Sequence, residues 1–327
     1  MDAGFLGVVR PILAITLICL GLAAVAIVDR GRYPTWLNPA RRRAIFHGVL
    51  LAGWIYAGYY TLTIFADGGP GGDAFYYWSV DVSDPYVGRY GGQWGTFTLF
   101  PYSPAAALVA STFALLPWPL FALTWSGLLL LVALWLSGGH FPLWLAFPPL
   151  IWLVIVGNIE LLMAAAIVLG FRWPQAWSFI VLTKVTPALG LLWFVVRREW
   201  VALGKAFTAT LVIVVVTAIF LPQQWRAWVG FLTSGSDEVN GWLPLALRLP
   251  AAALLVIWGA HTDRRWTVLA AMLLAVPHFS FATAGALVAL SRPELARQRS
   301  AGPATDPVEA VVTPAASTRG STSGDPG

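Results

Sequence analysis

Charged residues are scarce in this sequence. Asp, Glu, Lys and Arg together make up 11% of its 327 residues, whereas a soluble domain carries roughly 25%. Hydrophobic residues make up 58%, and apolar runs recur along nearly the whole chain. These proportions exclude a water-soluble globular domain and a disordered chain. They predict an all-α polytopic membrane protein, because a helix satisfies its own backbone hydrogen bonds inside a bilayer.

Several kinds of site are also missing from the sequence. Cys19 is the only cysteine, which excludes an intramolecular disulfide and a cysteine zinc cluster. The sequence has no Walker loop, no zinc-spaced His/Cys cluster and no Ser nucleophile elbow. We therefore expect neither a cofactor nor a metal site. The net charge of +5 is attributed to basic loops that set the orientation in the membrane, so nucleic acid is not an expected partner.

The few charges separate into two kinds of loop. Loop 29–43 is rich in arginine, whereas loop 67–102 holds four aspartates against Arg89. By the positive-inside rule the first loop is cytoplasmic and the second lies outside. The basic segments near 197–205 and 292–299 indicate that the C-terminus is cytoplasmic.

The apolar runs predict about ten or eleven transmembrane helices in a multi-pass membrane domain over residues 1–300. The run 266–290 is interpreted either as one kinked span or, preferably, as a hairpin with its tip outside. Segment 223–232 could lie flat at the interface, and 301–327 is expected to be a disordered cytoplasmic tail. The other spans are expected near 5–28, 45–66, 103–117, 120–137, 142–156, 159–171, 175–196, 206–221 and 243–260.

Asp73 is the first candidate for chemistry. It follows a glycine-rich stretch in the outer loop and precedes Tyr76 and Tyr77. Glycines there would let the backbone approach a ligand closely, and the aromatics would form a short interfacial helix that offers stacking surface to a sugar. Asp73 would then be a catalytic base. The alternative is a helix N-cap, for which Asp is a favoured residue. The residues favour the two interpretations about equally, and both can hold.

Lys184 and Glu160 are the ionisable residues that fall within the apolar core. An ionisable group in a bilayer is costly and usually functional. Lys184 would receive a phosphate group about two turns below the outer surface, with Thr186 in the same break of the helix. The alternative is an internal ion pair with Glu160. The span count puts Asn158 and Glu160 towards the inner side, away from Asp73.

The remaining candidates are His278 and Arg89. His278, in the middle of run 266–290, would lie at the outer hairpin tip, where it could bond Asp73 or a sugar hydroxyl. Its alternative role is that of a helix-kink residue. Arg89, in the outer loop, is a second possible phosphate ligand.

Short motifs in a fixed order carry a resemblance to a known family. They are GGDAFYY (71–77), YSP (102–104), GNIE (157–160), TKVTP (183–187), RREW (197–200) and PH (277–278). The sequence resembles the bacterial polyprenyl-phosphate-dependent glycosyltransferases of the GT-C type, and within them glycosyltransferase family 87, which includes actinobacterial mannosyltransferases. The similarity spans roughly residues 67–290. Relatives often have Gly-Gln where this chain has Gly157 and Asn158.

The resemblance implies many membrane helices around an outer-facing active site, in which the family's acid, lysine and histidine map to Asp73, Lys184 and His278. It also implies a hexosyltransferase that moves a sugar, commonly mannose, from polyprenyl phosphate to a glycolipid or polysaccharide acceptor in the cell envelope. A single base on one face predicts inversion at the anomeric carbon. Asp73 and His278 are thus the catalytic candidates. The substrate-binding candidates are Lys184, Tyr76, Tyr77, Arg89, Asn158, Glu160 and Thr186. The competing class is a transporter or flippase of lipid-linked sugar.

Overall fold

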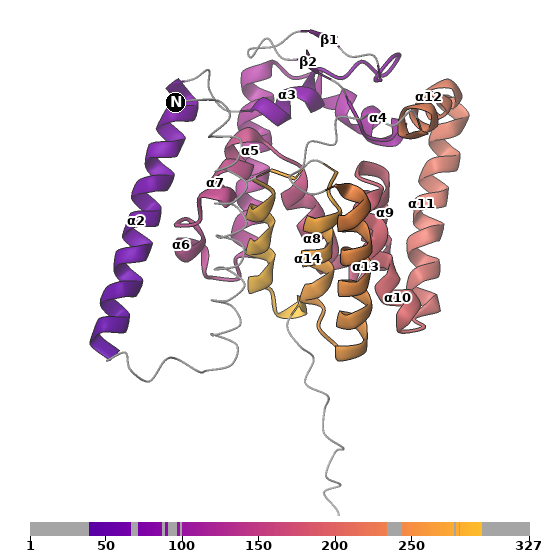
Figure 1. The fold of residues 1–327 in the computed structure, drawn as a ribbon. Coiled ribbons are helices and arrows are strands. Elements are labelled where there is room, and N and C mark those ends of the chain that lie inside the picture. The colour runs from indigo at the N-terminus through magenta and orange to yellow at the C-terminus, as the bar shows by residue number, and fades with distance from the viewer. Residues whose placement is uncertain are drawn as a thin grey trace, which may run out of the picture. The chain divides into compact units, whose positions relative to one another are not determined.

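A computed structural model gives the fold, and it describes residues 39–66, 71–86, 89–90, 97–98, 100–233, 244–277, 279–280 and 282–295. The predicted span 5–28, His278 and the predicted tail lie outside the described residues. The described residues are almost entirely helical. They include one two-stranded antiparallel ladder, in which β1 (Arg89–Tyr90) pairs with β2 (Phe97–Thr98) (Figure 1). The prediction of an all-α membrane protein is confirmed.

The helices differ widely in length. In chain order they are α2 (Pro39–Ala66), α3 (Gly72–Trp78), α4 (Pro104–Phe113), α5 (Trp118–Leu136), α6 (Phe141–Trp144), α7 (Pro148–Val156), α8 (Glu160–Gly170), η1 (Pro174–Ala176), α9 (Trp177–Thr183), η2 (Thr186–Leu191), α10 (Leu192–Val196), α11 (Trp200–Phe220), α12 (Pro222–Thr233), α13 (Leu245–Thr262), α14 (Trp266–Ala275), η3 (Ala282–Ser291) and η4 (Pro293–Leu295).

Three of the described helices, α5, α11 and α13, are long and apolar enough to cross a membrane by themselves. The pair α7 and α8 makes a fourth if it counts as one span, although it is bent by 107°. The predicted span 45–66 lies within the 28-residue helix α2, and the remaining predicted spans among the described residues appear as shorter or broken helices. Proline explains many of the starts, since it occupies the first turn of α4, α5, α6 and α7, where its missing N–H costs nothing.

Helix α4 does not cross the membrane, which corrects the predicted span 103–117. Its ten residues cover about 15 Å. Ser103, its N-cap, donates its backbone N–H to Leu182 O (3.1 Å), while Leu116 O, just past its end, accepts from Trp78 Nε1 (2.8 Å). The start of α4 is therefore bonded to the end of α9, two residues before Lys184, and the segment after α4 is bonded to the end of α3. The chain therefore makes one crossing fewer here than the sequence analysis assumed.

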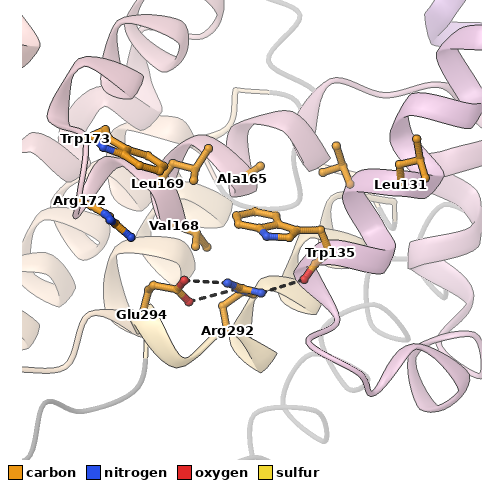
Figure 2. Close-up of a pocket in the computed structure, with 10 residues that line it drawn as sticks. Leu131, Trp135, Ala165, Val168, Leu169, Arg172, Trp173, Arg292 and Glu294 are labelled. Atoms are coloured by element: carbon orange, nitrogen blue, oxygen red, sulfur yellow. Dashed lines mark hydrogen bonds and ion pairs between the residues drawn. The ribbon is translucent and has the colours of Figure 1, made fainter.

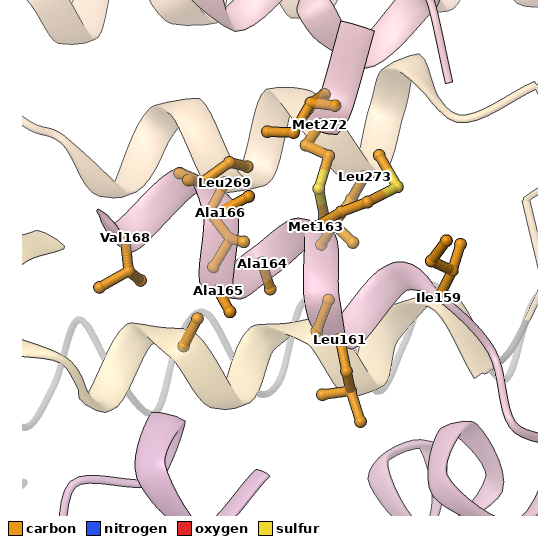
Figure 3. Packing of buried hydrophobic residues seen from close by; sticks show 14 of the residues in the cluster. Ile159, Leu161, Met163, Ala164, Ala165, Ala166, Val168, Leu269, Met272 and Leu273 are labelled. Carbon is orange, nitrogen blue, oxygen red and sulfur yellow. The ribbon is translucent and has the colours of Figure 1, made fainter. Parts of the chain in front are cut away.

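The core is built around α8, whose alanines let neighbouring helices approach closely. Ala164, Ala165 and Ala166 are buried in its middle. Figure 3 shows Leu161 and Met163 of α8 together with Leu269 and Met272 of α14, and all four side chains are fully buried or nearly so. This packing places the first turn of α8, and with it Glu160, deep in the protein.

The run 266–290 forms the predicted hairpin. The guanidinium of Arg265, just before α14, lies 4.9 Å from the ring of Phe171 at the end of α8. At the other end of α14, Ala275 O accepts from Thr186 Oγ1 (2.6 Å). After η3, Arg292 returns to donate to Trp135 O (3.2 Å), near the end of α5. The hairpin interpretation is therefore confirmed, with its tip near Thr186.

Segment 223–232 forms α12, a helix that packs against Tyr86 and Pro101. Trp228 is buried and its Nε1 donates to Pro101 O (3.4 Å). Phe231 stacks on Tyr86 with ring centroids 5.9 Å apart. The predicted aromatic helix is thus present, and two of its aromatic side chains hold it against described residues that precede α4.

Candidate active site

Asp73 lies in the first turn of α3 and is not its N-cap. The N-cap is Gly71, whose φ of 100° is a conformation that favours glycine. The N–H of Gly71 donates to Ile155 O (2.8 Å), which fastens the start of α3 to the end of α7. The N-cap alternative for Asp73 is therefore wrong. Its carboxylate is presented at the junction between α3 and the bend after α7.

Gly157 makes the bend between α7 and α8 possible. It caps α7 with φ at 81°. A Cβ there would lie 2.6 Å from the Cβ of Ala74 in α3, so a side chain has no room. Trp125 Nε1 of α5 donates to Gly157 O (2.8 Å) and satisfies a carbonyl that the bend removes from the helix. Three elements therefore converge on this one residue.

Asn158 connects the bend to Asp73. Its Nδ2 donates to Asp73 Oδ2 over 2.6 Å, and its Oδ1 accepts from Glu160 N over 2.8 Å. The expectation that Asn158 and Glu160 lie at the inner side, away from Asp73, is wrong. The reason is α4, which returns to the side it started from, so that the bend after α7 falls at the Asp73 end of the helices.

Lys184 occupies a break in the predicted span 175–196. Helix α9 ends at Thr183, Lys184 is extended (φ −133°, ψ 108°), and the chain resumes as η2 at Thr186. Pro187 favours this break because it removes a backbone donor and clashes with a continuing helix. Lys184 Nζ bonds Glu160 Oε1 at 2.7 Å, with 14% of the lysine and 1% of the glutamate side chain exposed. The predicted internal ion pair is present.

Glu160 is only half satisfied by this pair. Its Oε2 is buried and has no hydrogen-bond partner in the structure. Its place in the first turn of α8 is electrostatically favourable for an acid. Asp73, Glu160 and Lys184 together carry a formal charge of −1. The described part of the site therefore holds one more carboxylate than ammonium group.

Two tyrosines line the cluster. Tyr77 OH lies 3.4 Å from Tyr102 OH and accepts from Ile159 N over 3.3 Å. Burial raises the pKa of Tyr77, and the charge of Asp73 acts in the same direction. The phenol therefore stays protonated and can donate a hydrogen bond. Tyr102 lies within electrostatic reach of Asp73, Glu160 and Lys184.

The structure thus brings together Asp73, Tyr77, Asn158, Glu160 and Lys184 of the predicted site. Thr186 lies at its edge and bonds the last residue of α14. Tyr76 is half-buried against the core. Arg89 pairs with Thr98 through the ladder, but its side chain lies outside the described part of the chain, as does the whole of His278.

Tyr102 and Trp125 contribute to the site but are not among the residues that the sequence predicts for it. Tyr102 directly precedes the capping Ser103 and Pro104, a pattern that marks a helix start and so turns Tyr102 back towards the previous element. That signal was available in the sequence. Trp125 lies inside an apolar run, and nothing local distinguishes it from the other tryptophans.

The model of glycosyltransferase family 87 matches residues 100–314 of the chain. The match includes Asn158, Glu160 and Lys184, whereas Asp73 precedes it. No curated protein and no solved structure matches the chain.

Proposed function

The chain belongs to glycosyltransferase family 87, and on that premise we propose that it transfers a hexose, mannose in the first instance, from a polyprenyl-phosphate donor to a glycolipid or polysaccharide acceptor. Family membership implies glycosyl transfer itself; the donor, sugar and acceptor are the proposal. The observation that carries it is the polar cluster, in which a carboxylate and a largely buried ammonium group are joined through Asn158 and Glu160.

The proposed reaction uses Asp73 as the base. Its carboxylate takes the proton of the acceptor hydroxyl while the acceptor oxygen attacks the anomeric carbon. The bond from that carbon to the phosphate oxygen breaks, and its electron pair leaves with the lipid phosphate. Attack from the face opposite the leaving group inverts the anomeric configuration. Asn158 holds one carboxylate oxygen of Asp73 by a 2.6 Å bond, so the carboxylate keeps its direction.

Lys184 stabilises the leaving phosphate. The charge on that group grows from −1 to −2 as the sugar departs, and an ammonium in a water-poor site is effective there. Glu160 Oε1 bonds this ammonium at 2.7 Å. Donor binding therefore places the phosphate beside a cation that Glu160 already holds. We propose His278 and Arg89 as further ligands of the sugar and the phosphate.

We propose that the site faces the outside of the cell membrane and that the C-terminus is cytoplasmic. The support is the charge bias of the loops, with arginine-rich 29–43 on one side and aspartate-rich 67–102 on the other. A donor whose sugar is attached to a lipid suits a catalytic cluster at the end of membrane helices.

The test is transfer from radiolabelled polyprenyl-phosphate mannose in membranes that contain the full chain. We expect label in a new glycolipid or polysaccharide. Asp73→Asn should lower transfer by at least about 100-fold, while the variant remains folded in the membrane. Full activity of that variant would rule out Asp73 as the base. Label that only changes leaflet would identify a flippase instead.

A further inference from the structure

A second site is formed at the other end of α5 and α8. A cavity of about 540 Å³ lies between these helices and the segment that follows η3. Its apolar wall comes from α5 and α8, and its rim is polar, as Figure 2 shows. The wall consists of Leu131, Val132, Trp135, Ala165, Val168 and Leu169. Arg172, Trp173, Arg292 and Glu294 complete the lining.

This cavity is separate from the Asp73 cluster. Helix α5 has 19 residues; it begins beside α3, where the Trp118 and Phe75 rings are 5.3 Å apart, and ends at the cavity. At 1.5 Å per residue this length is roughly 28 Å, close to the thickness of the hydrocarbon core. Helix α8 begins with Glu160 and ends next to Arg172, and its 11 residues separate the two sites by about 16 Å along this helix. The cavity therefore lies at the level of the lipid headgroups in the opposite leaflet, where the indoles of Trp135 and Trp173 are typical residues.

Arg292 is held at the rim by several hydrogen bonds, and two of its N–H groups remain available to a ligand. Its Nε and one terminal nitrogen bond the two oxygens of Glu294 at 3.1 and 2.7 Å, and its other terminal nitrogen donates to Trp135 O at 3.2 Å. Its guanidinium also lies 4.5 Å from the ring of Trp135. These bonds use three of the five N–H groups of an arginine. One N–H on each terminal nitrogen remains for a ligand.

Arg172 supplies the excess charge. It is exposed, its guanidinium lies 4.9 Å from the ring of Trp173, and no carboxylate of the described residues pairs with it. With Glu294 neutralising Arg292, the rim carries a formal charge of +1. An oxyanion of charge −1 beside an apolar wall complements this arrangement.

We infer that the cavity binds an anionic phospholipid. Its phosphate lies against Arg172 and the remaining N–H groups of Arg292, and one acyl chain runs along Leu131 and Leu169. A zwitterionic phospholipid brings the same phosphate but adds an ammonium group to a rim that is already positive. The site therefore prefers phosphatidylglycerol to phosphatidylcholine. This preference does not depend on the sugar donor, because the phospholipid binds the cavity from the leaflet opposite the Asp73 cluster.

The experiment is native mass spectrometry of the full chain released from nanodiscs that contain equal parts phosphatidylglycerol and phosphatidylcholine. We expect bound phosphatidylglycerol to exceed bound phosphatidylcholine. Arg172→Gln should reduce the retained phosphatidylglycerol by roughly fivefold, the scale of one basic residue at an anionic membrane surface. Arg172→Lys should retain most of it.

Two variants serve as matched controls. Lys205→Gln removes an exposed cation that does not line the cavity. Lys205 lies near the start of α11, a helix that packs against η1. This variant should retain phosphatidylglycerol fully. Asp73→Asn should also retain it, which separates this site from the donor site. Equal binding of the two phospholipids, or an Arg172→Gln variant that retains as much phosphatidylglycerol as Lys205→Gln, would overturn the inference. The unfolding temperature of each variant shows that the fold is intact.

Discussion

Asn158 and Asp73, 85 positions apart in the sequence, are joined by a 2.6 Å hydrogen bond from amide to carboxylate. The same side chain accepts the N–H of Glu160. Asn158 therefore orients the proposed base and starts the helix that carries the counterion of Lys184. A change at this one residue acts on both halves of the proposed mechanism.

Replacing the amide with a carboxylate should change the pH dependence of transfer. In Asn158→Asp two carboxylates would face each other at hydrogen-bond distance, and such a pair retains a shared proton to higher pH than a single carboxylate does. Asp73 is proposed to act deprotonated, so the acidic limb of the pH–rate profile should move to higher pH. Asn158→Leu should lower the rate without that shift. An unchanged profile in Asn158→Asp would contradict the proposed base.

The pair Lys184 and Glu160 allows structure and function to be separated. Lys184→Met leaves a carboxylate with 1% exposure unpaired, which should cost about 3–5 kcal/mol in the free energy of unfolding. The double variant Lys184→Met, Glu160→Gln removes both charges and should recover most of that loss. Transfer should stay low in both variants, because the cation for the leaving phosphate is gone. Recovery of activity in the double variant would show that the lysine is only structural.

Gly157→Ala should destabilise the protein and separate α3 from α8. The new Cβ would meet the Cβ of Ala74 at 2.6 Å, and φ is 81°. Overpacking and backbone strain of this kind cost about 1–3 kcal/mol. Gly127→Ala is the matched control, because a Cβ at this α5 position has nothing within 4 Å; it should be neutral or slightly stabilising. Equal unfolding temperatures for the two variants would refute the close packing.

Arg248 should be needed to hold the end of α14. Its buried guanidinium donates to the carbonyls of Leu274, Val276 and Pro277 at 3.2, 2.7 and 2.9 Å. Arg248→Met leaves these carbonyls unpaired and should cost about 2 kcal/mol or more. Arg248→Lys should recover little, because an ammonium lacks the planar fork. Arg226→Met, which removes an exposed arginine of α12, is the control in thermal unfolding.

The sequence was sufficient for the general class of fold and for the residue types in the site. Low charge and repeated apolar runs predicted membrane helices. The rarity of charge inside those runs selected Lys184 and Glu160, and their pairing was correctly proposed as the alternative to a free cation. The hairpin after Trp266 followed from the basic residues at both of its ends.

The sequence was not sufficient for the path of the chain between these residues. Segment 103–117 is as apolar as a crossing helix, but α4 ends after ten residues and returns. Hydropathy indicates that a segment is buried in an apolar phase. It does not distinguish a helix that crosses the membrane from one that returns to the same side. That error in the count of crossings put Asn158 at the wrong side. Segment 175–196 is a second one, because Lys184 in its middle reaches Glu160 at the start of α8, whereas Trp193 packs on Phe171 at the end of α8. The buried side chains of Trp125 and Arg248 bond partners 26 to 32 positions away, which no local pattern encodes.

The bend at Gly157 has a use beyond this protein. Only a residue without a side chain lets Ala74 of α3 approach the junction of α7 and α8, so position 157 indicates whether the amide at 158 can reach the carboxylate at 73. A family member with a bulkier residue at the equivalent position must hold its acid in some other way. The residue at this one position therefore predicts, from sequence, which relatives share this arrangement of the active site.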